Sequence, residues 1–272
     1  MKVAIQGEPG SFSHEAAMKL IADAVIVPQP LSADVFAALS SGTVDAAVIP
    51  IENSLAGSVL EHFDLLLTHD VQVERETLLR IRHNLIANVG ATIDDIKRVF
   101  SHPVALAQCR RFLAEHPEMQ SVAFYDTAGG VKQLIESHDR HAAAIASEAA
   151  ARYYGASILQ ANIEDNPENY TRFFQVRRTC DSVRDPQANK ISIAFSVENR
   201  PGTLVAALSA LSATGTNLTK IESRPVHGKP WEYVFYVDCQ IASVEEGSRA
   251  LSALAAHCAM VKELGRYQEA RE

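Results

Sequence analysis

Stretches typical of buried strands alternate with stretches typical of helices from the start of the chain, and this alternation constrains the fold more than any other feature. Residues Lys2 to Gln6 predict a strand, Ser13 to Asp23 a helix, and Asp45 to Ile51, which reads DAAVIPI, a second buried strand. Helices that recur between strands have to cover a sheet, so the pattern predicts a layered α/β architecture.

The same rhythm continues to about residue 180. The further helices expected there are Ala33 to Ser40, Gly57 to Thr68, Ala105 to Glu115, Gly130 to Ser137 and Glu148 to Tyr154. The further extended segments are Val25 to Val27, Val71 to Asn88, Val122 to Tyr125, Ala142 to Ala146, Ser157 to Ile163 and Thr171 to Arg177. The last two return toward the first half, so we expect two α/β lobes with a cleft between them, the usual place for a small-molecule site.

A polar stretch without periodicity, Cys180 to Asn189, separates this region from a second unit. The elements expected after it are Lys190 to Val197, Pro201 to Thr214, Leu218 to Arg224, Tyr233 to Gln240, Val244 to His257 and Met260 to Tyr267. Their order, βαββαβ, is the ferredoxin-like pattern. The prediction is therefore a catalytic domain over 1–180, a linker over 181–189 and a smaller domain over 190–272.

Charge and cysteine usage exclude several classes of protein. The formal net charge is −8 and no basic block occurs, which argues against a nucleic-acid partner. No apolar run reaches transmembrane length, and the N-terminus lacks the long apolar stretch of a signal peptide, so we expect a cytoplasmic protein without a membrane partner. The four cysteines have no CxxC spacing, which predicts reduced thiols and neither a structural zinc nor a disulfide framework.

Four strand-to-helix turns carry polar residues that could border one cleft. They are Gly7 to Glu15, Ile51 to Ser54, Ser101 to Cys109 and Asp126 to Gly130. The first could present backbone N–H groups to an anion, or be only a tight turn. The others could be solvated loops and caps, and Gln108 could be surface filler within a helix. Ser11 and His14 lack a nucleophile elbow, which argues against a hydrolytic pair.

A fifth segment, Asn169 to Phe174, begins a predicted strand. An arginine at Arg172 could hold a carboxylate through a two-pronged contact, or form a structural salt bridge.

Taken in order, these motifs resemble the prephenate dehydratase family. The segments are GEPGSFSHEAA from Gly7, IENS from Ile51, SHPVALAQC from Ser101, DTAGG from Asp126 and NYTRFF from Asn169. The C-terminal unit resembles an ACT domain that senses phenylalanine, through NRPGTLV from Asn199, IESRP from Ile221 and HGKPWE from His227. Thr203 stands where alanine is usual.

The resemblance implies a fold and an activity. The fold is a two-lobed catalytic domain like that of periplasmic binding proteins, followed by a ferredoxin-like ACT domain. The activity is that of a carbon–oxygen lyase, which converts prephenate to phenylpyruvate with loss of water and carbon dioxide, in phenylalanine biosynthesis. No metal or organic cofactor is implied.

The resemblance also implies residue roles. The expected catalytic residues are Thr171 at the leaving hydroxyl, with Glu52, Asn53, Ser54, Ser101 and Gln108. The expected substrate-binding residues are Ser11, Thr127, Ala128, Gly129, Arg172 and Phe173. Phenylalanine would bind at an interface between two ACT domains, lined by Gly202, Thr203, Leu204, Val205, Asn217, Leu218, Glu222, Ser223, Arg224 and Pro225. Such a shared site implies a homodimer or a homotetramer.

Two other functions stay open at the level of the sequence. Arogenate dehydratase, or an enzyme that accepts both substrates, performs the same chemistry on the amino analogue of prephenate. The turn from Thr127 to Val131 is the place where the family analogy puts this selectivity. A non-catalytic sensor of amino acids would combine a two-lobed cleft with an ACT domain and would bind phenylalanine without turnover.

Overall fold

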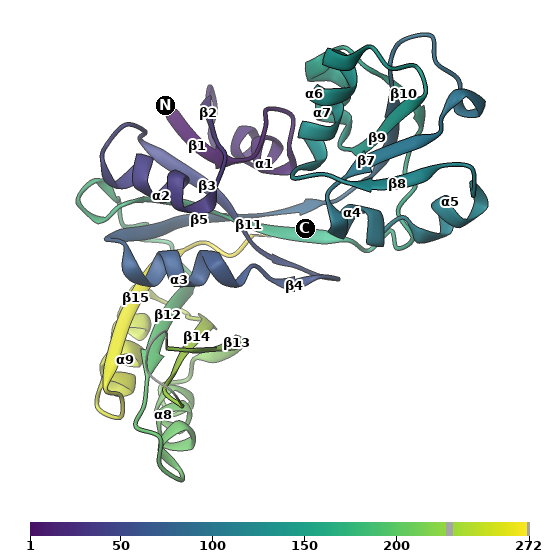
Figure 1. Cartoon of the computed structure of the whole chain (residues 1–272). Coiled ribbons are helices and arrows are strands. Elements are labelled where there is room, and N and C mark those ends of the chain that lie inside the picture. Colours follow the sequence, from purple (N-terminus) through teal and green to yellow (C-terminus); the bar gives the residue numbers. More distant parts are fainter. Residues whose placement is uncertain (227–230, 271–272) are drawn as a thin grey trace. The chain divides into compact units, whose positions relative to one another are not determined.

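The computed structural model describes residues 1–226 and 231–270 (Figure 1). The chain forms two compact units, Met1–Val59 with Thr77–Phe173, and Leu60–Glu76 with Phe174–Glu272. Two strands, β5 (Val71–Arg80) and β11 (Tyr170–Arg178), pass from one unit into the other. The domain boundaries expected from the sequence stay a prediction, because these units divide the chain at other points.

The first unit begins with strands and helices that alternate as far as β3, as the sequence predicts, before a short strand follows. These elements are β1 (Lys2–Gln6), α1 (Phe12–Leu20), β2 (Val25–Gln29), α2 (Ser32–Ser40), β3 (Ala46–Asn53) and β4 (Gly57–Ser58). Strand β1 pairs in parallel with both β2 and β3, and β4 folds back antiparallel on β3. Parallel strands joined by helices bury both faces, which explains the uninterrupted apolar run of β3.

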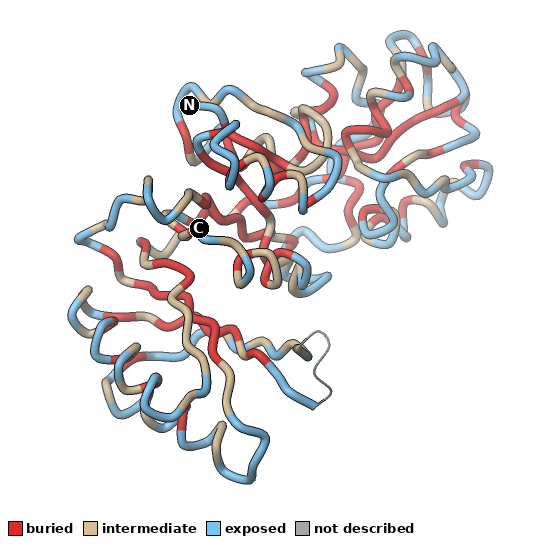
Figure 2. Tube along the Cα trace, turned by 60° about the vertical axis from the view of Figure 1, so that its left-hand side comes forward, coloured by how far each residue is buried: buried red, intermediate tan, exposed pale blue. Residues whose placement is uncertain are grey.

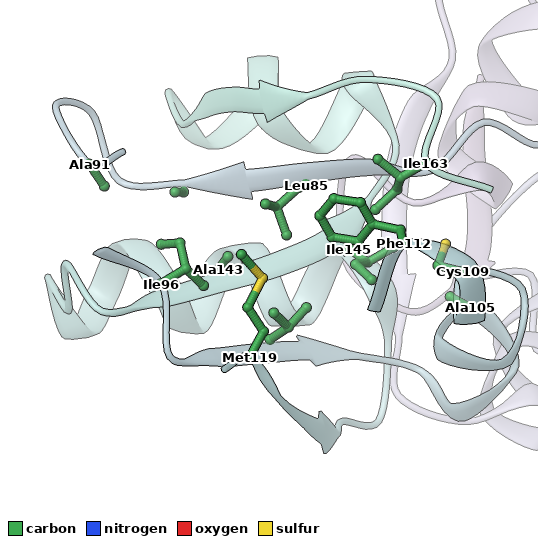
Figure 3. Packing of buried hydrophobic residues seen from close by; sticks show 12 residues of the cluster. Leu85, Ala91, Ile96, Ala105, Cys109, Phe112, Met119, Ala143, Ile145 and Ile163 are labelled. Atoms are coloured by element: carbon green, nitrogen blue, oxygen red, sulfur yellow. The ribbon is translucent and has the colours of Figure 1, made fainter. Parts of the chain in front are cut away.

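A second sheet of the first unit has the order β10-β6-β9-β7-β8. Its elements are β6 (Asn84–Ala87), η1 (Ile93–Asp95), β7 (Arg98–Ser101), α4 (Pro103–Ala107), α5 (Arg110–Glu115), β8 (Gln120–Ala123), α6 (Thr127–Ser137), β9 (Ala142–Ala146), α7 (Glu148–Tyr154) and β10 (Ser157–Gln160). Figure 3 shows Leu85, Phe112 and Ile145 packed together on one face of this sheet. Each fully buried side chain of this size contributes roughly 1.5–3 kcal/mol to stability.

The second unit contains the predicted βαββαβ series. Its elements are α3 (Leu60–Thr68), the first part of β5, η2 (Thr179–Asp181), β12 (Lys190–Ser196), α8 (Thr203–Ser212), β13 (Asn217–Pro225), β14 (Tyr233–Gln240), α9 (Val244–Ala255) and β15 (Met260–Tyr267). The strand order β13-β14-β12-β15 is antiparallel throughout and ferredoxin-like. The predicted α/β class is therefore confirmed. Figure 2 shows the buried residues concentrated along the strands.

Beside β15, the first part of β5 extends the sheet of the second unit through a parallel contact between Gly265 and Val73. A Cβ on Gly265 would lie 2.2 Å from the carbonyl oxygen of Val73, so only glycine allows this approach. The segment HGKPWE of the ACT resemblance lies partly outside the described residues, at 227–230.

Several predicted helices differ in their bounds from those observed, for example Ser13–Asp23, which is Phe12–Leu20, and Gly130–Ser137, which is Thr127–Ser137. Three further differences have a visible cause. The helix expected over Gly57–Thr68 begins only at Leu60, because Gly57 has φ +85° and belongs to β4. The helix expected from Pro201 begins at Thr203, because Gly202 has φ +85° and precedes it as the N-cap. The helix expected over Ala105–Glu115 is broken into α4 and α5.

The break between α4 and α5 has a cause outside the helix. Asp165 accepts hydrogen bonds from the backbone N–H groups of Arg110 and Arg111, at 3.0 and 2.9 Å. Its carboxylate thus caps the N-terminus of a separate helix, α5. The carbonyl oxygen of Gln108 in turn accepts from the N–H of Asp165 at 2.7 Å. Gln108 thereby becomes the C-cap of α4 rather than a residue within a helix.

Candidate active site

A cavity of about 460 Å³ lies within the first unit. Its wall is formed by the turn between β1 and α1, the end of β3, the residues before β6, helix α4, the residues before α6 and the start of β11. This volume suits a small organic molecule. All five polar motifs of the catalytic region therefore contribute residues to one cavity.

Half of the residues expected at the site line this cavity. They are Ser11, Asn53, Gln108, Thr127, Thr171 and Phe173. Thr171 and Phe173 are two positions apart on β11, so both project from the same face of the strand.

The other half do not line the cavity. They are Glu52, Ser54, Ser101, Ala128, Gly129 and Arg172. The buried Arg172 lies between Thr171 and Phe173, so it faces the opposite side of β11, where its Nη2 is 3.7 Å from Oε2 of Glu52. The structure thus contains the salt bridge that the sequence left open for Arg172.

Two of these residues have hydroxyl groups that bind backbone. Ser54 Oγ donates to the carbonyl oxygen of Glu168 at 3.1 Å and accepts from the N–H of Tyr170 at 3.0 Å. Ser101 is fully buried, and its Oγ donates to the carbonyl oxygen of Ile145 at 2.6 Å. Both contacts hold the strands that carry the cavity wall.

The hydroxyl of Thr171 is held by the side chain of Asn53. Asn53 Nδ2 donates to Thr171 Oγ1 at 2.9 Å, and Thr171 is 8% exposed. An amide nitrogen has no lone pair to accept with, so this contact uses an oxygen lone pair and leaves the hydroxyl proton available. Thr171 can therefore donate a hydrogen bond into the cavity.

Asn53 belongs to a chain of amides that ends at a histidine. Asn53 Nδ2 also donates to Asn169 Oδ1 at 2.7 Å, and Asn169 Nδ2 donates to Gln108 Oε1 at 3.0 Å. Gln108 Oε1 lies 2.9 Å from Nε2 of His83, which lines the cavity and is 2% exposed. Burial lowers the pKa of His83 below its usual value, so the ring is neutral near pH 7.

Helix N-termini supply the positive potential of the cavity. Among the described residues, those that line it include no lysine or arginine. Helix α1 begins there with Ser11 as N-cap, whose hydroxyl accepts from the N–H of His14, and α6 begins there at Thr127. Backbone N–H groups at such ends attract anions. The anion-binding interpretation of the first turn is thus compatible with the geometry.

One carboxyl group, Asp126, also lines the cavity. Both of its oxygens accept from backbone, Oδ2 from Glu8 N and Oδ1 from Ala128 N, each at 2.7 Å. Burial raises the pKa of Asp126, and these N–H bonds oppose the rise. A Cβ on Gly7, at φ +89°, would lie 2.0 Å from Asp126 Oδ2, which explains glycine at this position.

Sequence reasoning missed three residues of the cavity wall or its hydrogen bonds, His83, Asn169 and Tyr125. Asn169 begins the motif NYTRFF, but the sequence indicates no role for its side chain. His83 is a lone histidine before a short strand, a pattern more typical of structural packing, and no spacing rule marks it. Tyr125 lines the cavity with an exposed side chain whose hydroxyl donates to Glu8 Oε1 at 3.1 Å.

Within residues 1–226 and 231–270, no group of three or more His, Cys, Asp or Glu side chains is arranged to hold a metal ion. Over the same residues, no helix is both long and apolar enough to cross a bilayer.

The residues expected at a phenylalanine site lie on two elements of the second unit. Gly202 caps α8, which carries Thr203, Leu204 and Val205. Asn217, Leu218, Glu222, Ser223, Arg224 and Pro225 all lie on β13, the edge strand of the sheet. Arg224 pairs there with Asp64 of α3, which raises the pKa of Arg224.

The fold and the site define a class, a two-sheet α/β unit with a cavity for a small molecule, joined to a ferredoxin-like domain. Comparison with known proteins agrees. The family model "Prephenate dehydratase" matches residues 3–181, and the model "ACT domain" matches residues 191–256. The chain belongs to the prephenate dehydratase family, whose reaction serves phenylalanine biosynthesis.

Three similar proteins illustrate the range of that family. "Arogenate dehydratase/prephenate dehydratase 2, chloroplastic" of Arabidopsis thaliana is 39% identical, over 98% of this chain and 72% of the relative. A prephenate dehydratase of Arthrobacter aurescens, solved in complex with L-Phe, has a TM-score of 0.90 and 31% identity, over 99% of this chain and 90% of that one. A structure described as GqqA, a novel type of quorum quenching acylase, has a TM-score of 0.89 and 31% identity, over 98% of both chains.

Proposed function

We propose that this chain converts prephenate to phenylpyruvate in the cavity of the first unit. The ring carboxylate leaves as carbon dioxide, the electron pair of its carbon–carbon bond moves into the ring, and the C4–oxygen bond breaks. The departing hydroxide takes a proton and leaves as water. Aromatisation drives the reaction, so the protein needs to assist the leaving group and to position the two ends of the substrate.

The observation that carries this proposal is the hydrogen bond from Asn53 to Thr171. Because Thr171 Oγ1 accepts from Asn53 at 2.9 Å, its own O–H group is free to donate a hydrogen bond to the leaving hydroxyl. A threonine hydroxyl is too weak an acid to give up its proton outright, so Thr171 acts as a hydrogen-bond donor. Such a bond strengthens as negative charge develops on the departing oxygen.

The electrostatics of the wall suit loss of carbon dioxide. Decarboxylation disperses a carboxylate charge, so a strong cation at that group would stabilise the ground state more than the transition state. The described wall offers helix N-termini, hydroxyls and amides instead of lysine or arginine. The apolar rings of Phe12 and Phe173 help to exclude water.

Arogenate is the second candidate substrate. The Arabidopsis relative carries both names, and arogenate has an ammonium where prephenate has a keto group. The carboxyl group of Asp126 lines the cavity and could face an ammonium. Each of its oxygens accepts one backbone N–H bond and keeps a second lone pair, so Asp126 does not decide between the two substrates. We keep prephenate as the first candidate because the matching family model is that of prephenate dehydratase.

Phenylalanine is the proposed inhibitor, bound where two ACT domains meet. Support comes from the solved relative with L-Phe and from exposed apolar side chains on α8 and β13, Val205, Leu218 and Ile221. An edge strand such as β13 is suited to pairing with a second copy of the chain. The proposal therefore includes a homodimer or a homotetramer.

For its location we propose the cytoplasm. All four cysteines, Cys109, Cys180, Cys239 and Cys258, are free thiols, as a reducing compartment favours.

One assay tests the proposed substrate and the proposed inhibitor together. Purified protein is mixed with prephenate, and phenylpyruvate is followed by its absorbance in alkali with and without phenylalanine, while arogenate is tested in parallel. Turnover of prephenate that phenylalanine suppresses is the expected result. Turnover of arogenate alone would make arogenate the substrate. If the protein turns over neither compound, the proposal is overturned.

A further inference from the structure

The polarity of the amide chain in the cavity is set by backbone groups at one end. Asn53 Oδ1 lies 3.1 Å from Leu55 N and 2.8 Å from Ala56 N. A backbone N–H can only donate, so the acceptor at this position has to be the oxygen of Asn53. The nitrogen of Asn53 then faces Asn169 and Thr171 as the donor.

The donor and acceptor of each further hydrogen bond in this chain follow from the bond before it. Asn169 receives the bond from Asn53 on its oxygen, so its nitrogen donates to Gln108 Oε1 at 3.0 Å. Gln108 Nε2 is then turned back toward Asn53 Oδ1, at 3.4 Å. At Gln108 Oε1 a second partner, His83 Nε2, approaches to 2.9 Å. An oxygen cannot donate, so Nε2 of His83 has to carry the proton.

The other nitrogen of His83 confirms that this tautomer suits the site. Nδ1 is buried and has no hydrogen-bond partner among the residues that the structure describes. An N–H there would be a buried donor without an acceptor, which costs more than a bare nitrogen. The ring is packed edge to face against Phe12, with 5.6 Å between centroids, and the backbone N–H of His83 donates to Glu164 Oε2. The imidazole is thus fixed from several sides.

We propose that His83 is a positioning residue: its neutral ring, with the proton on Nε2, holds the amide of Gln108 in the orientation that fits both Asn169 and the backbone-fixed Asn53. Gln108 and Asn169 in turn support Asn53 where it donates to Thr171. This role rests on the proposed function, because it matters only if the Thr171 hydroxyl assists the leaving group. If His83 carried its proton on Nδ1, the bare Nε2 would favour a flipped Gln108. Its oxygen would then meet Asn53 Oδ1, and its nitrogen would meet Asn169 Nδ2.

Two substitutions separate this role from general packing. The side-chain nitrogen of glutamine reaches the place of histidine Nε2, whereas asparagine ends one bond shorter, near Nδ1. His83→Gln can therefore still donate to Gln108, and His83→Asn cannot. The full-length variants are compared with the wild type in kcat and KM for prephenate, and circular dichroism reports their folding.

The expected result is a difference in kcat. His83→Asn should lower kcat by about 10- to 100-fold, the usual effect of a lost buried hydrogen bond, with KM changed by less than about threefold. His83→Gln should keep kcat within about threefold of the wild type. A folded His83→Asn variant with wild-type kcat would overturn the role, as would His83→Gln if it fell as far as His83→Asn.

The tautomer can be measured in the wild-type chain, with a variant used only to assign the signal. With ¹⁵N-labelled histidine, the His83 signal is the one of ten that vanishes in His83→Gln, and in the wild type it should show a protonated Nε2 and a bare Nδ1 near pH 7. A protonated Nδ1 at His83 would overturn the inference even if prephenate is turned over. A wild-type chain that turns over neither prephenate nor arogenate would instead overturn the proposed function.

Discussion

At the scale of single residues, the site depends on groups whose orientation is decided by backbone rather than by other side chains. Asn53 is fixed by two N–H groups, and Asp126 accepts two more. Side chains held in this way lose little entropy when a substrate binds, so the cavity is preorganised before the reaction begins.

Gly7 offers a direct test of this close packing. In Gly7→Ala the new Cβ would clash with Asp126 Oδ2 at 2.0 Å and also hold φ +89°, so the free energy of unfolding should fall by roughly 2–4 kcal/mol. Gly90→Ala is the matched control, because Gly90 has φ +84° but nothing within 4 Å of its Cβ position, and it should cost about 1 kcal/mol. Equal losses in urea unfolding would show that the Asp126 contact does not matter.

The burial of His83 predicts how stability depends on pH. Its folded-state pKa is lowered, so between that value and the unfolded value the unfolded chain binds more protons. Stability should therefore fall as the pH drops below about 6.5, and it should level off below the folded pKa. His83→Gln should remove part of this fall. His138→Asn, which changes an exposed histidine at φ 53°, should keep it.

At the scale of elements, the break between α4 and α5 places Gln108 in the cavity wall. The sequence from Ala105 to Glu115 is apolar and helical in spacing, so one helix was the natural prediction. The cap comes from Asp165, more than fifty positions away, and no local rule can find it.

Replacing that cap should affect both stability and turnover. Asp165→Ala removes two acceptors from the start of α5, so the free energy of unfolding should fall by about 1–2 kcal/mol. It should also lower kcat, because a loosened start of α5 lets Gln108 shift at the end of α4, although the backbone bond to Gln108 remains. Asp165→Asn keeps one acceptor and should lie between Asp165→Ala and the wild type. If Asp165→Ala lowers stability but leaves kcat at the wild-type value, the Asp165 cap does not position Gln108 for catalysis.

Other elements show what a single sequence can and cannot predict. The strands β9, β14 and β15 and helix α7 have the predicted bounds, because turn residues and apolar periodicity mark both of their ends. The predicted starts of α3 and α8 are too early, because Gly57 and Gly202 adopt positive φ values that a helix does not allow. The surrounding turn decides the φ of a glycine, so the sequence alone does not show it. The motifs located Thr171, Asn53 and Gln108, but which strand face a side chain takes, as for Arg172 and Ser101, required the sheet.

At the scale of the whole molecule, the chain combines a catalytic cavity with an ACT domain. Helix α8 and strand β13 of that domain carry an exposed apolar surface. If two copies meet there, Leu218→Lys should weaken the dimer and the inhibition by phenylalanine. A lysine at the centre of an interface would bury an unpaired charge, which costs more than the loss of the leucine contact alone. Sedimentation and inhibition curves measure both effects, with basal turnover expected to stay the same.

A matched control for this prediction is Val183→Lys. Val183 is 71% exposed and lies outside α8 and β13, whereas Leu218 is 38% exposed on the edge strand. The control should change neither association nor inhibition. If Leu218→Lys behaves in the same way as Val183→Lys, the proposed interface lies elsewhere.

The most direct test of the central claim is the kcat of Thr171→Ala with saturating prephenate, beside the wild type and Thr171→Ser. Loss of the donor to the leaving hydroxyl should lower kcat by about 10²- to 10⁴-fold, whereas serine keeps a hydroxyl near Asn53 and should retain most of the activity. A folded Thr171→Ala chain that turns over prephenate at nearly the wild-type rate would contradict the account.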